Sequence, residues 1–370
     1  MKVALVHEFL TQLGGAERVL QAFHEMFPEA PIFTLIYDRQ KTRGLFANWG
    51  IRTSFLQKIY TPPFIPPLTK GGRGGVSYKW LLPLMPRAIE SFDFAGYDLV
   101  LSDSSAFAKG AMTKKPTVHI CYCHTPTRYL WQDMENYVSS IKYHGLIKAA
   151  AKFYLKNHLK KWDYEAAQRP DFFIANSRTV QGRIKKYYNR DSEVIYPPVD
   201  TEFFRPLPSS LSRPGEGRGE VEPRQYYLTA SRLEPYKKIG LVIEAFNRLG
   251  LPLKVAGEGT EAQSLKRKAQ NNIEFLGRVS DEQLRELYRS AKAFIFPSLE
   301  DSGIMILESL ACGTPVIAYG KGGAVEFIRD GENGVLMSEQ SVDQLFSIAK
   351  RWSMQKFDPA KLHESVRQYD

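Results

Sequence analysis

The chain has 370 residues, of which 50 are Lys or Arg and 40 are Asp or Glu, so its net charge is +10 at pH 7. This charge favours ligands or surfaces that carry phosphate. Hydrophobic residues make up 43% of the chain, which is ordinary for a globular protein, and the length favours two domains. The sequence contains no zinc finger, RNP-type motif or basic zipper, so no nucleic-acid partner is expected.

The three cysteines, Cys121, Cys123 and Cys312, give no disulfide framework and fit a reducing compartment. One Cys-Tyr-Cys pair does not make a zinc site. The first residues are expected to form a strand and not a signal peptide, because the apolar run is short and charged residues follow at once. No window reaches the ~18 apolar residues of a membrane span. A cytoplasmic location is therefore expected.

The first half of the chain alternates short apolar runs with helical patterns. Strands are expected at residues 2–6, 31–37, 97–102, 118–123 and 172–177. After the first strand, Gly14 and Gly15 permit a close approach of the backbone, and a helix is expected from Ala16. This turn lacks the G-x-G-x-x-G pattern and is a weak signal by itself.

Residues 141–169 are expected to form one long helix with seven Lys or Arg and two acids. Apolar side chains such as Leu155, Leu159 and Trp162 recur in it at helical spacing. One interpretation is a basic amphipathic face, residues 142–169, that lies on anionic lipid at the inner face of the membrane. The same pattern also fits a solvated helix that packs on its own core.

Two stretches rich in Gly and Pro, at about 61–78 and at 208–224, are expected to be flexible surface inserts. With these as guides, the predicted organisation has four parts. They are an N-terminal domain at 1–200, a linker and insert at 201–224, a second domain at 225–350, and a C-terminal segment at 351–370 that crosses back to the first domain.

The second half repeats the alternation, with strands expected at residues 226–231, 253–256, 273–276, 291–296 and 316–319. Strands that alternate with helices in both halves predict two parallel, doubly wound α/β domains. Ligands of such sheets bind beyond the carboxyl ends of the strands. The polar loops at these ends are therefore the candidate site.

The most informative stretch runs from residue 297 to residue 315. A helix is expected over 304–311, opened by Gly303, so its first N–H groups and positive dipole end favour a bound phosphate. Glu300 lies just before this helix, and Glu308 about one and a half turns inside it. Acids on both sides of a phosphate suit a ligand with hydroxyl groups at both ends, such as a nucleotide-sugar.

Two cations follow the first strand of the second half. Arg232 and Lys237 are expected to neutralise a departing diphosphate. The turns at Gly257 and Val279 end the next two strands, and each is expected to bring its backbone close to a nucleotide, although both also fit ordinary turns.

In the first half, His124 ends a strand and is expected to act at the reacting carbon by hydrogen bonding or proton transfer. Arg128 and Trp131 follow, with the side chains to bind an acceptor's phosphate and sugar face. No D-x-D motif occurs, so no obligatory divalent metal or other cofactor is expected.

These motifs resemble those of the retaining glycosyltransferases of family 4, which have the GT-B fold. The stretch from Glu300 to Glu308 looks like the family's E-x7-E motif, and Arg232 and Lys237 resemble its donor-phosphate pair. Gly14-Gly15 and His124-Thr-Pro are similar to its glycine turn and its histidine. Nearly the whole chain takes part in the resemblance. One departure is Ser302, where the family usually has Phe.

The resemblance implies two Rossmann-like domains facing across a crevice, the first binding the acceptor and the second the nucleotide-sugar. His124, Arg232, Lys237 and Glu300 would be catalytic. The donor would be bound by Gly14, Gly15, Gly257, Val279, Gly303, Ile304, Met305 and Glu308, with the ribose on Glu308. Arg128 and Trp131 would bind the acceptor.

The implied activity is metal-independent transfer of a hexose, with mannose from GDP-mannose preferred, to a glycan or lipid-linked acceptor in surface polysaccharide or glycolipid assembly. Two alternatives remain open. One is an epimerase or hydrolase of nucleotide-sugars with the same fold. The other is an inactive relative that binds glycans as a scaffold.

Overall fold

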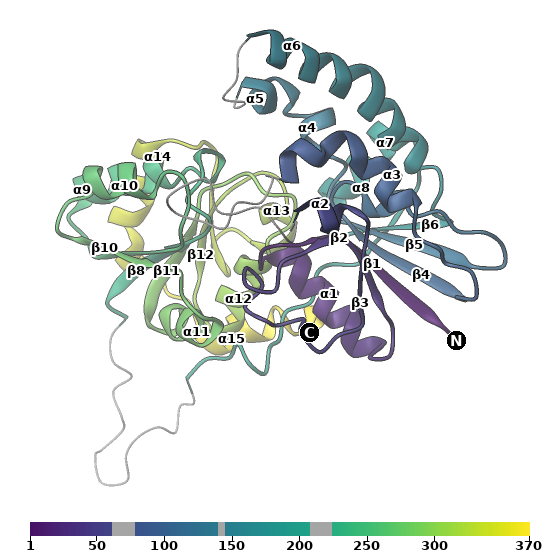
Figure 1. Ribbon diagram of the computed structural model, residues 1–370. Helices are drawn as coiled ribbons and strands as arrows, with labels where there is room; N and C mark the ends of the chain where they lie inside the picture. Colours follow the sequence, from purple (N-terminus) through teal and green to yellow (C-terminus); the bar gives the residue numbers. More distant parts are fainter. Residues whose placement is uncertain (61–77, 140–144, 208–223) are drawn as a thin grey trace. The chain divides into compact units, whose positions relative to one another are not determined.

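The computed structural model describes residues 1–60, 78–139, 145–207 and 224–370. The expected inserts at 61–78 and 208–224 therefore fall almost wholly outside the described residues. The contacts between residues divide the chain into two compact units, unit 1 from Met1 to Tyr196 and unit 2 from Pro197 to Asp370 (Figure 1).

Unit 1 is built on a parallel sheet with the order β3-β2-β1-β4-β5-β6-β7 in the described part of the chain. The strands are β1 (Val3–Leu10), β2 (Ile32–Tyr37), β3 (Ile51–Thr53), β4 (Leu99–Ser104), β5 (Val118–Cys123), β6 (Phe172–Ala175) and β7 (Glu193–Val194). Alternate residues of β1 enter different cores: Ala4 and Val6 pack on one face of the sheet, Val3 and Leu5 on the other. Burial on both faces explains why the first four residues of this strand, Val3 to Val6, are all apolar instead of alternating.

Helices cover both faces of this sheet (Figure 1). The α-helices are α1 (Gly15–Met26), α2 (Leu56–Tyr60), α3 (Met85–Glu90), α4 (Arg128–Trp131), α5 (Met134–Ser139), α6 (Gly145–Tyr154), α7 (Lys160–Ala166) and α8 (Arg178–Tyr188). The remaining turns of helix are η1 (Tyr78–Leu84), η2 (Ala108–Gly110) and the π-helical η3 (Leu155–Leu159).

The long helix predicted over 141–169 is present from residue 145 to residue 166, and residues 141–144 lie outside the described residues. It is interrupted by one π-helical stretch, η3, at which Leu155 and Leu159 are buried. The extra residue in a π turn shifts the register of the helix, so α7 presents a different set of side chains to the core than a continuous α-helix would.

Unit 2 holds a second parallel sheet, with the order β10-β9-β8-β11-β12-β13 in the residues described. Its strands are β8 (Tyr226–Ala230), β9 (Leu253–Ala256), β10 (Ile273–Gly277), β11 (Ala291–Phe296), β12 (Val316–Tyr319) and β13 (Gly334–Met337). Its helices are η4 (Pro235–Lys237), α9 (Ile239–Leu249), α10 (Ala262–Lys268), α11 (Asp281–Ser290), α12 (Ile304–Ala311), α13 (Ala324–Phe327), α14 (Val342–Lys350), η5 (Trp352–Met354), α15 (Pro359–Glu364) and η6 (Arg367–Tyr369).

The prediction of two parallel, doubly wound α/β domains is confirmed, and each expected strand is present. The sequence patterns did not predict β3, β7 or β13, which are short edge strands.

The C-terminal residues pack within unit 2. His363 of α15 lies with its Nδ1 2.7 Å from the Ala311 carbonyl at the end of α12. The Val199 N–H donates to the Tyr369 carbonyl at 2.9 Å, so the start of unit 2 pairs with its end. The predicted contact of residues 351–370 with the first domain stays a prediction.

Cys121, Cys123 and Cys312 are all buried with free thiols. Burial raises the pKa of each thiol, that of Cys121 to about 12. Thiols held protonated in apolar surroundings are chemically inert.

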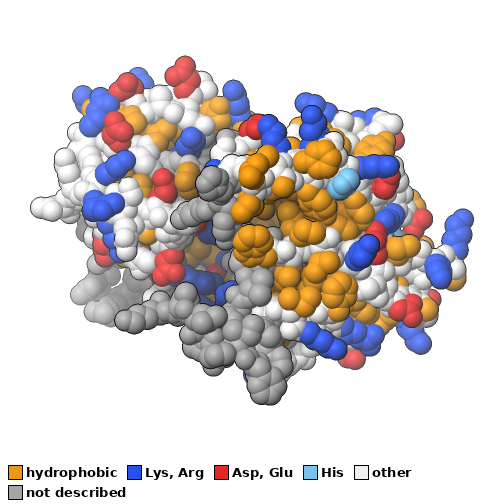
Figure 2. Space-filling view, turned by 45° about the horizontal axis from the view of Figure 1, so that its top comes forward, with side chains coloured by type: hydrophobic (Ala, Val, Ile, Leu, Met, Phe, Trp, Pro, Cys, Tyr) orange, Lys and Arg blue, Asp and Glu red, His pale blue; other side chains and the backbone are white. Residues whose placement is uncertain are grey.

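Across the part of the chain that the structure describes, no helix is both long and apolar enough to cross a membrane. Unit 1 nevertheless exposes large apolar side chains, and the space-filling view shows hydrophobic side chains gathered on one face with Lys and Arg around them (Figure 2). Leu146 and Phe153 of α6 are 83% and 63% exposed. They belong to the predicted amphipathic helix.

Candidate functional site

In each sheet the strand order reverses at one place, between β1 and β4 in unit 1 and between β8 and β11 in unit 2. The loops that leave two such strands run in opposite directions and open a space at their carboxyl ends, which is where doubly wound sheets bind ligands. Of the predicted site residues, Lys237 and Glu300 lie at the second reversal, and His124 lies close to the first.

Lys237 and Glu300 form an ion pair at the reversal in unit 2. Lys237 lies in η4, after β8, and Glu300 lies after β11, with Nζ 2.5 Å from Oε1. Their side chains are 14% and 18% exposed, so the pair is largely shielded yet still open to a ligand. Arg232 donates from Nη2 to the Tyr236 hydroxyl at 2.8 Å, and Nζ of Lys237 lies 5.3 Å from the Tyr236 ring centre. The three predicted charged residues therefore lie close together.

The turns after β8, β9 and β10 pack backbone against backbone. Gly257 has a φ of +127°, and a Cβ there would lie 1.8 Å from the Ser231 carbonyl oxygen, so no other residue fits without a shift. Its N–H donates to the Gly277 carbonyl at 2.6 Å. Val279 follows two residues later and is half-buried. Gly257 and Val279 thus lie in adjacent turns, and their predicted contact with the donor stays a prediction.

The loop after β12 holds the backbone of Glu300 in place. Gly322 has a φ of +70°, and a Cβ on it would lie 2.2 Å from the Glu300 carbonyl oxygen. The Gly323 N–H donates to that same oxygen at 2.8 Å. Glu300 is therefore fixed at its backbone by one loop and at its carboxylate by Lys237.

Helix α12 begins beside this pair. Gly303 is its N-cap and offers no side-chain cap, while Ile304 and Met305 make up the start of its first turn. The first N–H groups of an α-helix have no intrahelical acceptor, so this end suits an anion. The Ser302 hydroxyl, just before it, is buried and has no hydrogen-bond partner among the described residues.

Glu308 lies within α12 and is only 1% exposed. Its Oε2 accepts a hydrogen bond of 3.3 Å from the hydroxyl of Tyr288, which is itself fully buried. Glu308 is thus more deeply buried than Glu300. Its predicted role at a ribose stays a prediction.

In unit 1, His124 is the outer member of a row of four titratable side chains. Its Nε2 contacts Asp103 Oδ1, and the other oxygen of Asp103 lies 2.8 Å from His7 Nδ1. His7 Nε2 in turn lies 3.7 Å from Glu17 Oε1. The His124 side chain is 14% exposed, and the other three are buried.

The charges in this row of four side chains stabilise one another. Burial lowers the pKa of His7, but its hydrogen bonds to Asp103 and Glu17 outweigh burial and raise the pKa to about 10. Burial also lowers the pKa of His124, yet the charge of Asp103 and the hydrogen bond to it give a net raised value. Burial raises the pKa of Asp103, and the two histidines more than reverse this, so its pKa is lowered. In both histidines and in Asp103 the pKa therefore moves in the direction that favours the charged form.

The predicted glycine turn lies at the other end of this row, beside Glu17. Gly14 is the N-cap of α1 and Gly15 its first residue, with no side-chain cap. Glu17 lies in that first turn, and its Oε2 is buried without a hydrogen-bond partner in the described ranges. A Cβ on Gly14 would lie 3.2 Å from that oxygen. A carboxylate therefore lies behind the amides that were predicted to face a phosphate.

Glu8, next to His7, organises the loop after β4. Its Oε1 accepts hydrogen bonds of 2.7–3.1 Å from consecutive backbone N–H groups, those of Ser105, Ala106, Phe107 and Ala108, and one of 3.0 Å from the Ser104 hydroxyl. Such a nest of amides is a strong anion site. Here the protein's own carboxylate fills it, which fixes the loop beside Asp103.

Trp131 and Arg128, the predicted acceptor residues, lie in α4. The Trp131 indole Nε1 donates to buried Asp163 at 2.7 Å, and its ring stacks on Tyr187. Asp163 also accepts from Lys109 Nζ at 2.6 Å. The polar edge of Trp131 thus already has a partner in the protein, while Arg128 is half-buried. Contact of either residue with an acceptor stays a prediction.

A second buried histidine lies on the same strand, five residues before His124. His119 Nε2 lies 2.8 Å from the Ser102 hydroxyl, and its Nδ1 has no partner within the described part of the chain. Burial lowers the pKa of His119 to about 4, so it is neutral at pH 7.

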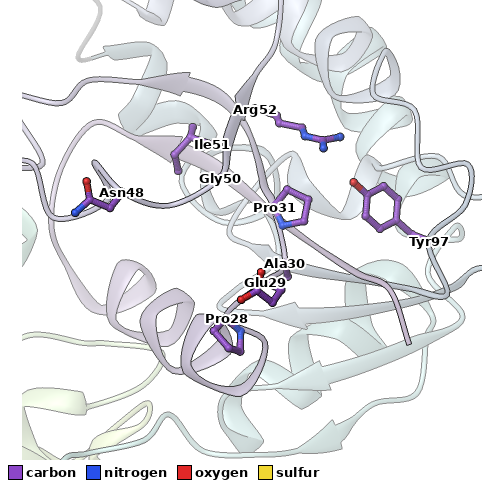
Figure 3. Close-up of a pocket in the computed structure, with 9 residues that line it drawn as sticks. All are labelled: Pro28, Glu29, Ala30, Pro31, Asn48, Gly50, Ile51, Arg52 and Tyr97. Atoms are coloured by element: carbon purple, nitrogen blue, oxygen red, sulfur yellow. The ribbon is translucent and has the colours of Figure 1, made fainter.

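A pocket of about 590 Å³ lies at the amino ends of strands in unit 1, opposite to their carboxyl ends (Figure 3). It is lined by residues near the amino ends of β2, β3 and β4, including Pro31, Ile51 and Tyr97. None of the predicted site residues borders it. Within the described ranges, no group of three or more His, Cys, Asp or Glu is arranged to hold a metal ion.

Sequence patterns missed the partners of His124, namely His7, Asp103 and Glu17. One signal was available: Asp103 places a carboxylate inside an apolar strand, and a buried acid needs a cation or hydrogen-bond donors nearby. Finding those donors requires the strand order, because His7 lies 96 residues away in the chain.

The chain matches two family models. The model for Glycosyltransferase Family 4 matches residues 13–203, more than half of the chain, and the model for glycosyl transferases group 1 matches residues 216–369. Among solved structures, that of Anabaena HepE in complex with UDP aligns over 100% of this chain and 99% of that chain, with a TM-score of 0.66 and 19% identity.

Curated relatives are similar over part of their length. A D-inositol 3-phosphate glycosyltransferase of Geodermatophilus obscurus is 31% identical over 45% of this chain and 42% of its own length. A GDP-mannose-dependent alpha-(1-6)-phosphatidylinositol monomannoside mannosyltransferase of Mycolicibacterium smegmatis is 30% identical over 41% of this chain and 44% of its own. The match thus covers less than half of either relative. From its family match and its two doubly wound units, the chain belongs to glycosyltransferase family 4 and has the GT-B fold.

Proposed function

We propose that the protein is a retaining, metal-independent glycosyltransferase. It moves a hexose, with mannose from GDP-mannose as the preferred donor, to a glycan or lipid-linked acceptor. The observation that carries this proposal is the Lys237–Glu300 ion pair, fixed at the strand reversal of unit 2 beside the uncapped start of α12.

The pair suits a nucleotide-sugar because its two members have different tasks. Lys237, with Arg232 close by, neutralises the diphosphate that builds up charge as the bond to the sugar breaks. The first-turn amides of α12 add donors for the same group. Glu300 accepts hydrogen bonds from the sugar hydroxyls. Because Lys237 and Glu300 already hold each other, little reorganisation is needed when the donor binds.

Unit 1 supplies the acceptor side and His124. The amides at Gly14 and Gly15 face the donor phosphates, and His124 contacts the reacting sugar. The acceptor hydroxyl attacks the face that the diphosphate leaves, which keeps the anomeric configuration. A mannose donor is supported by the GDP-mannose-dependent relative, whose printed activity is that of a mannosyltransferase. A lipid-linked acceptor is supported by the phosphatidylinositol mannoside in the same name.

Peripheral contact with an anionic membrane is part of this proposal. Leu146 and Phe153 protrude from α6, and the helical stretch that continues into α7 carries several lysines. Some of this charge is already neutralised, since Lys152 pairs with Glu135 at 2.6 Å. Apolar side chains that enter the interface and lysines that meet lipid phosphates would hold the enzyme near a lipid-linked acceptor.

The test uses Lys237→Ala and Glu300→Ala, with Lys254→Ala as the matched control. Lys254 pairs with Glu274 at 3.5 Å in the same unit but away from the strand reversal. Thermal shifts with GDP-mannose, UDP-glucose and ADP-glucose identify the donor, and product NMR reports the anomeric configuration. Loss of one preorganised transition-state contact costs about 10²–10³-fold in turnover. Full transfer by either site variant would contradict the assignment.

A further inference from the structure

Two histidines share one buried aspartate beside the strand reversal of unit 1. His7 and His124 contact different oxygens of Asp103, which is fully buried. The four side chains from Glu17 to His124 come from α1, β1, β4 and the residue after β5. Such a cluster is costly to bury unless every charge is compensated, so its presence calls for a role beyond packing.

The geometry dictates which nitrogen of His124 carries out each task. Ionised Asp103 only accepts hydrogen bonds, so the His124 Nε2 that faces it must carry a proton. Nδ1 makes no hydrogen bond to the residues that the structure describes, and it is the nitrogen left for a ligand. His7 holds the second oxygen of Asp103, which stops the carboxylate from rotating away from His124.

We propose that Asp103 and His7 are positioning residues that hold His124 as a protonated hydrogen-bond donor, with Nε2–H on Asp103 and Nδ1–H available to the substrate. This inference rests on the proposed function, in which His124 contacts the reacting sugar. It adds that His124 donates a hydrogen bond there and does not remove a proton.

The charged surroundings of His124 agree with this assignment. Asp103 from β4 and Glu8 from β1 both raise its pKa, while His7 from β1 and burial oppose them. The Tyr122 ring, from β5, meets the imidazole edge to face at 5.3 Å. Glu17 balances the charge of His7, so His7 can hold Asp103 without displacing the proton of His124.

A donor at this position has a consequence for the reaction. The bond from the acceptor oxygen to the anomeric carbon forms as the bond to the diphosphate oxygen breaks. The acceptor's proton passes to the departing diphosphate, because His124 already holds both of its protons. His124 keeps those protons throughout and stabilises oxygen atoms of the sugar or diphosphate by hydrogen bonding.

The first experiment measures His124 without any substrate. The full-length protein, labelled with ¹⁵N-histidine, is titrated by NMR, and the His124 signals are identified by their loss in His124→Gln. In the wild type we expect His124 to remain an imidazolium above pH 7. Asp103→Asn should lower its pKa by at least about one unit, because a carboxylate at this range shifts a pKa by about 1–3 units. His7→Gln should instead raise it slightly, because the positive charge of His7 lowers the pKa of His124.

Ser102→Ala is the matched control, since it removes the hydrogen-bond partner of His119 on the opposite face of the sheet. It should change the His119 signals and leave the pKa of His124 unaltered. A wild-type His124 that titrates at or below 6.5 would overturn the proposal, and this measurement stands even if Asp103→Asn does not fold.

The second experiment follows donor turnover against pH with GDP-mannose or UDP-glucose. Asp103→Asn should move the alkaline limb of the profile to lower pH, whereas lower turnover with an unmoved limb would show a merely structural role and contradict the inference. If no nucleotide-sugar binds at all, the proposed function fails, and the NMR titration still decides the role of Asp103.

Discussion

His119 and His124 lie five residues apart at the two ends of β5, and both have a partner on β4. Ser102 and Asp103 are consecutive, so their side chains point to opposite faces of the sheet, and each meets one histidine. Burial lowers the pKa of His119 to about 4, while the pKa of His124 is raised. Burial is the largest single influence on the pKa of both histidines and lowers it in each. Only at His124 do the charge and hydrogen bond of a carboxylate partner outweigh burial.

The difference separates a structural histidine from a candidate functional one. His119 is fully buried and neutral at pH 7, and it fills a polar position between strands. His124 has a raised pKa and is partly exposed at the carboxyl end of its strand. The three variants below test this separation, starting with the largest expected effect.

The distinction between His119 and His124 would be lost if both contributed equally to activity. His124→Gln should lower donor turnover by about 10²-fold or more, since removing one preorganised hydrogen-bond donor to the transition state costs about this much. His119→Gln should stay within a few-fold of the wild type. Turnover of GDP-mannose or UDP-glucose, measured by release of the nucleotide, checks both variants. A His119→Gln protein as impaired as His124→Gln would remove the distinction.

The stability of the protein in acid should depend on His119. Its pKa is about 4 in the folded chain and near 6.5 when unfolded, so below pH 6.5 the unfolded state binds a proton that the folded state does not. The free energy of unfolding therefore decreases as the pH is lowered through this window, by about 2 kcal/mol between pH 6.5 and pH 5.

Urea unfolding at pH 7 and pH 5 should show that His119→Gln loses less stability than the wild type does, by about 2 kcal/mol. His7 and His124 have raised pKa values, so their contribution is present below pH 6.5 and is lost as the pH rises through each raised pKa, which for His7 is about 10. This contribution is the same in the wild type and in His119→Gln, so it does not affect the difference between them. An equal loss in both would place the acid sensitivity elsewhere.

The smallest effect on turnover is expected from Ser102→Ala. It leaves His119 with neither nitrogen hydrogen-bonded, and an unsatisfied buried group costs about 1–3 kcal/mol of stability. Thermal or urea unfolding measures this, and donor turnover should hardly change. A drop in turnover without a drop in stability would mean that the His119 side of the sheet also serves the reaction.

Most of the fold follows from patterns in the chain. The strands β8, β9, β11 and β12 are short apolar runs with polar or glycine residues at their ends, so their positions could be predicted closely. The edge strands could not. Residues of β3 are half-buried or exposed, and this strand exists because it pairs with β2, which no local pattern reveals.

The π-helical stretch η3 was equally beyond prediction. A continuous α-helical pattern places Leu155 and Leu159 on one stripe, and the observed shift depends on how that stripe meets the core of unit 1. Tertiary packing decides such a local change of register.

The candidate site divides in the same way. Lys237 and Glu300 could be singled out because each lies in the loop that follows a predicted strand, and the structure places them in contact. The partners of His124 could not, because they become neighbours only when β1, β4 and β5 are side by side. Ser302 stands between these cases: the sequence showed an unusual residue, and the structure adds that its hydroxyl is buried and unsatisfied.

The three buried thiols have a practical consequence for spectroscopy. Alkylating reagents attack the thiolate, which Cys121, Cys123 and Cys312 scarcely form at neutral pH. The natural chain is therefore a nearly silent background for site-specific labelling, and none of its cysteines has to be replaced. A single cysteine introduced at Leu146, which is 83% exposed, would carry a polarity-sensitive dye on α6. Its emission on addition of anionic vesicles would report directly whether this helix enters a lipid surface.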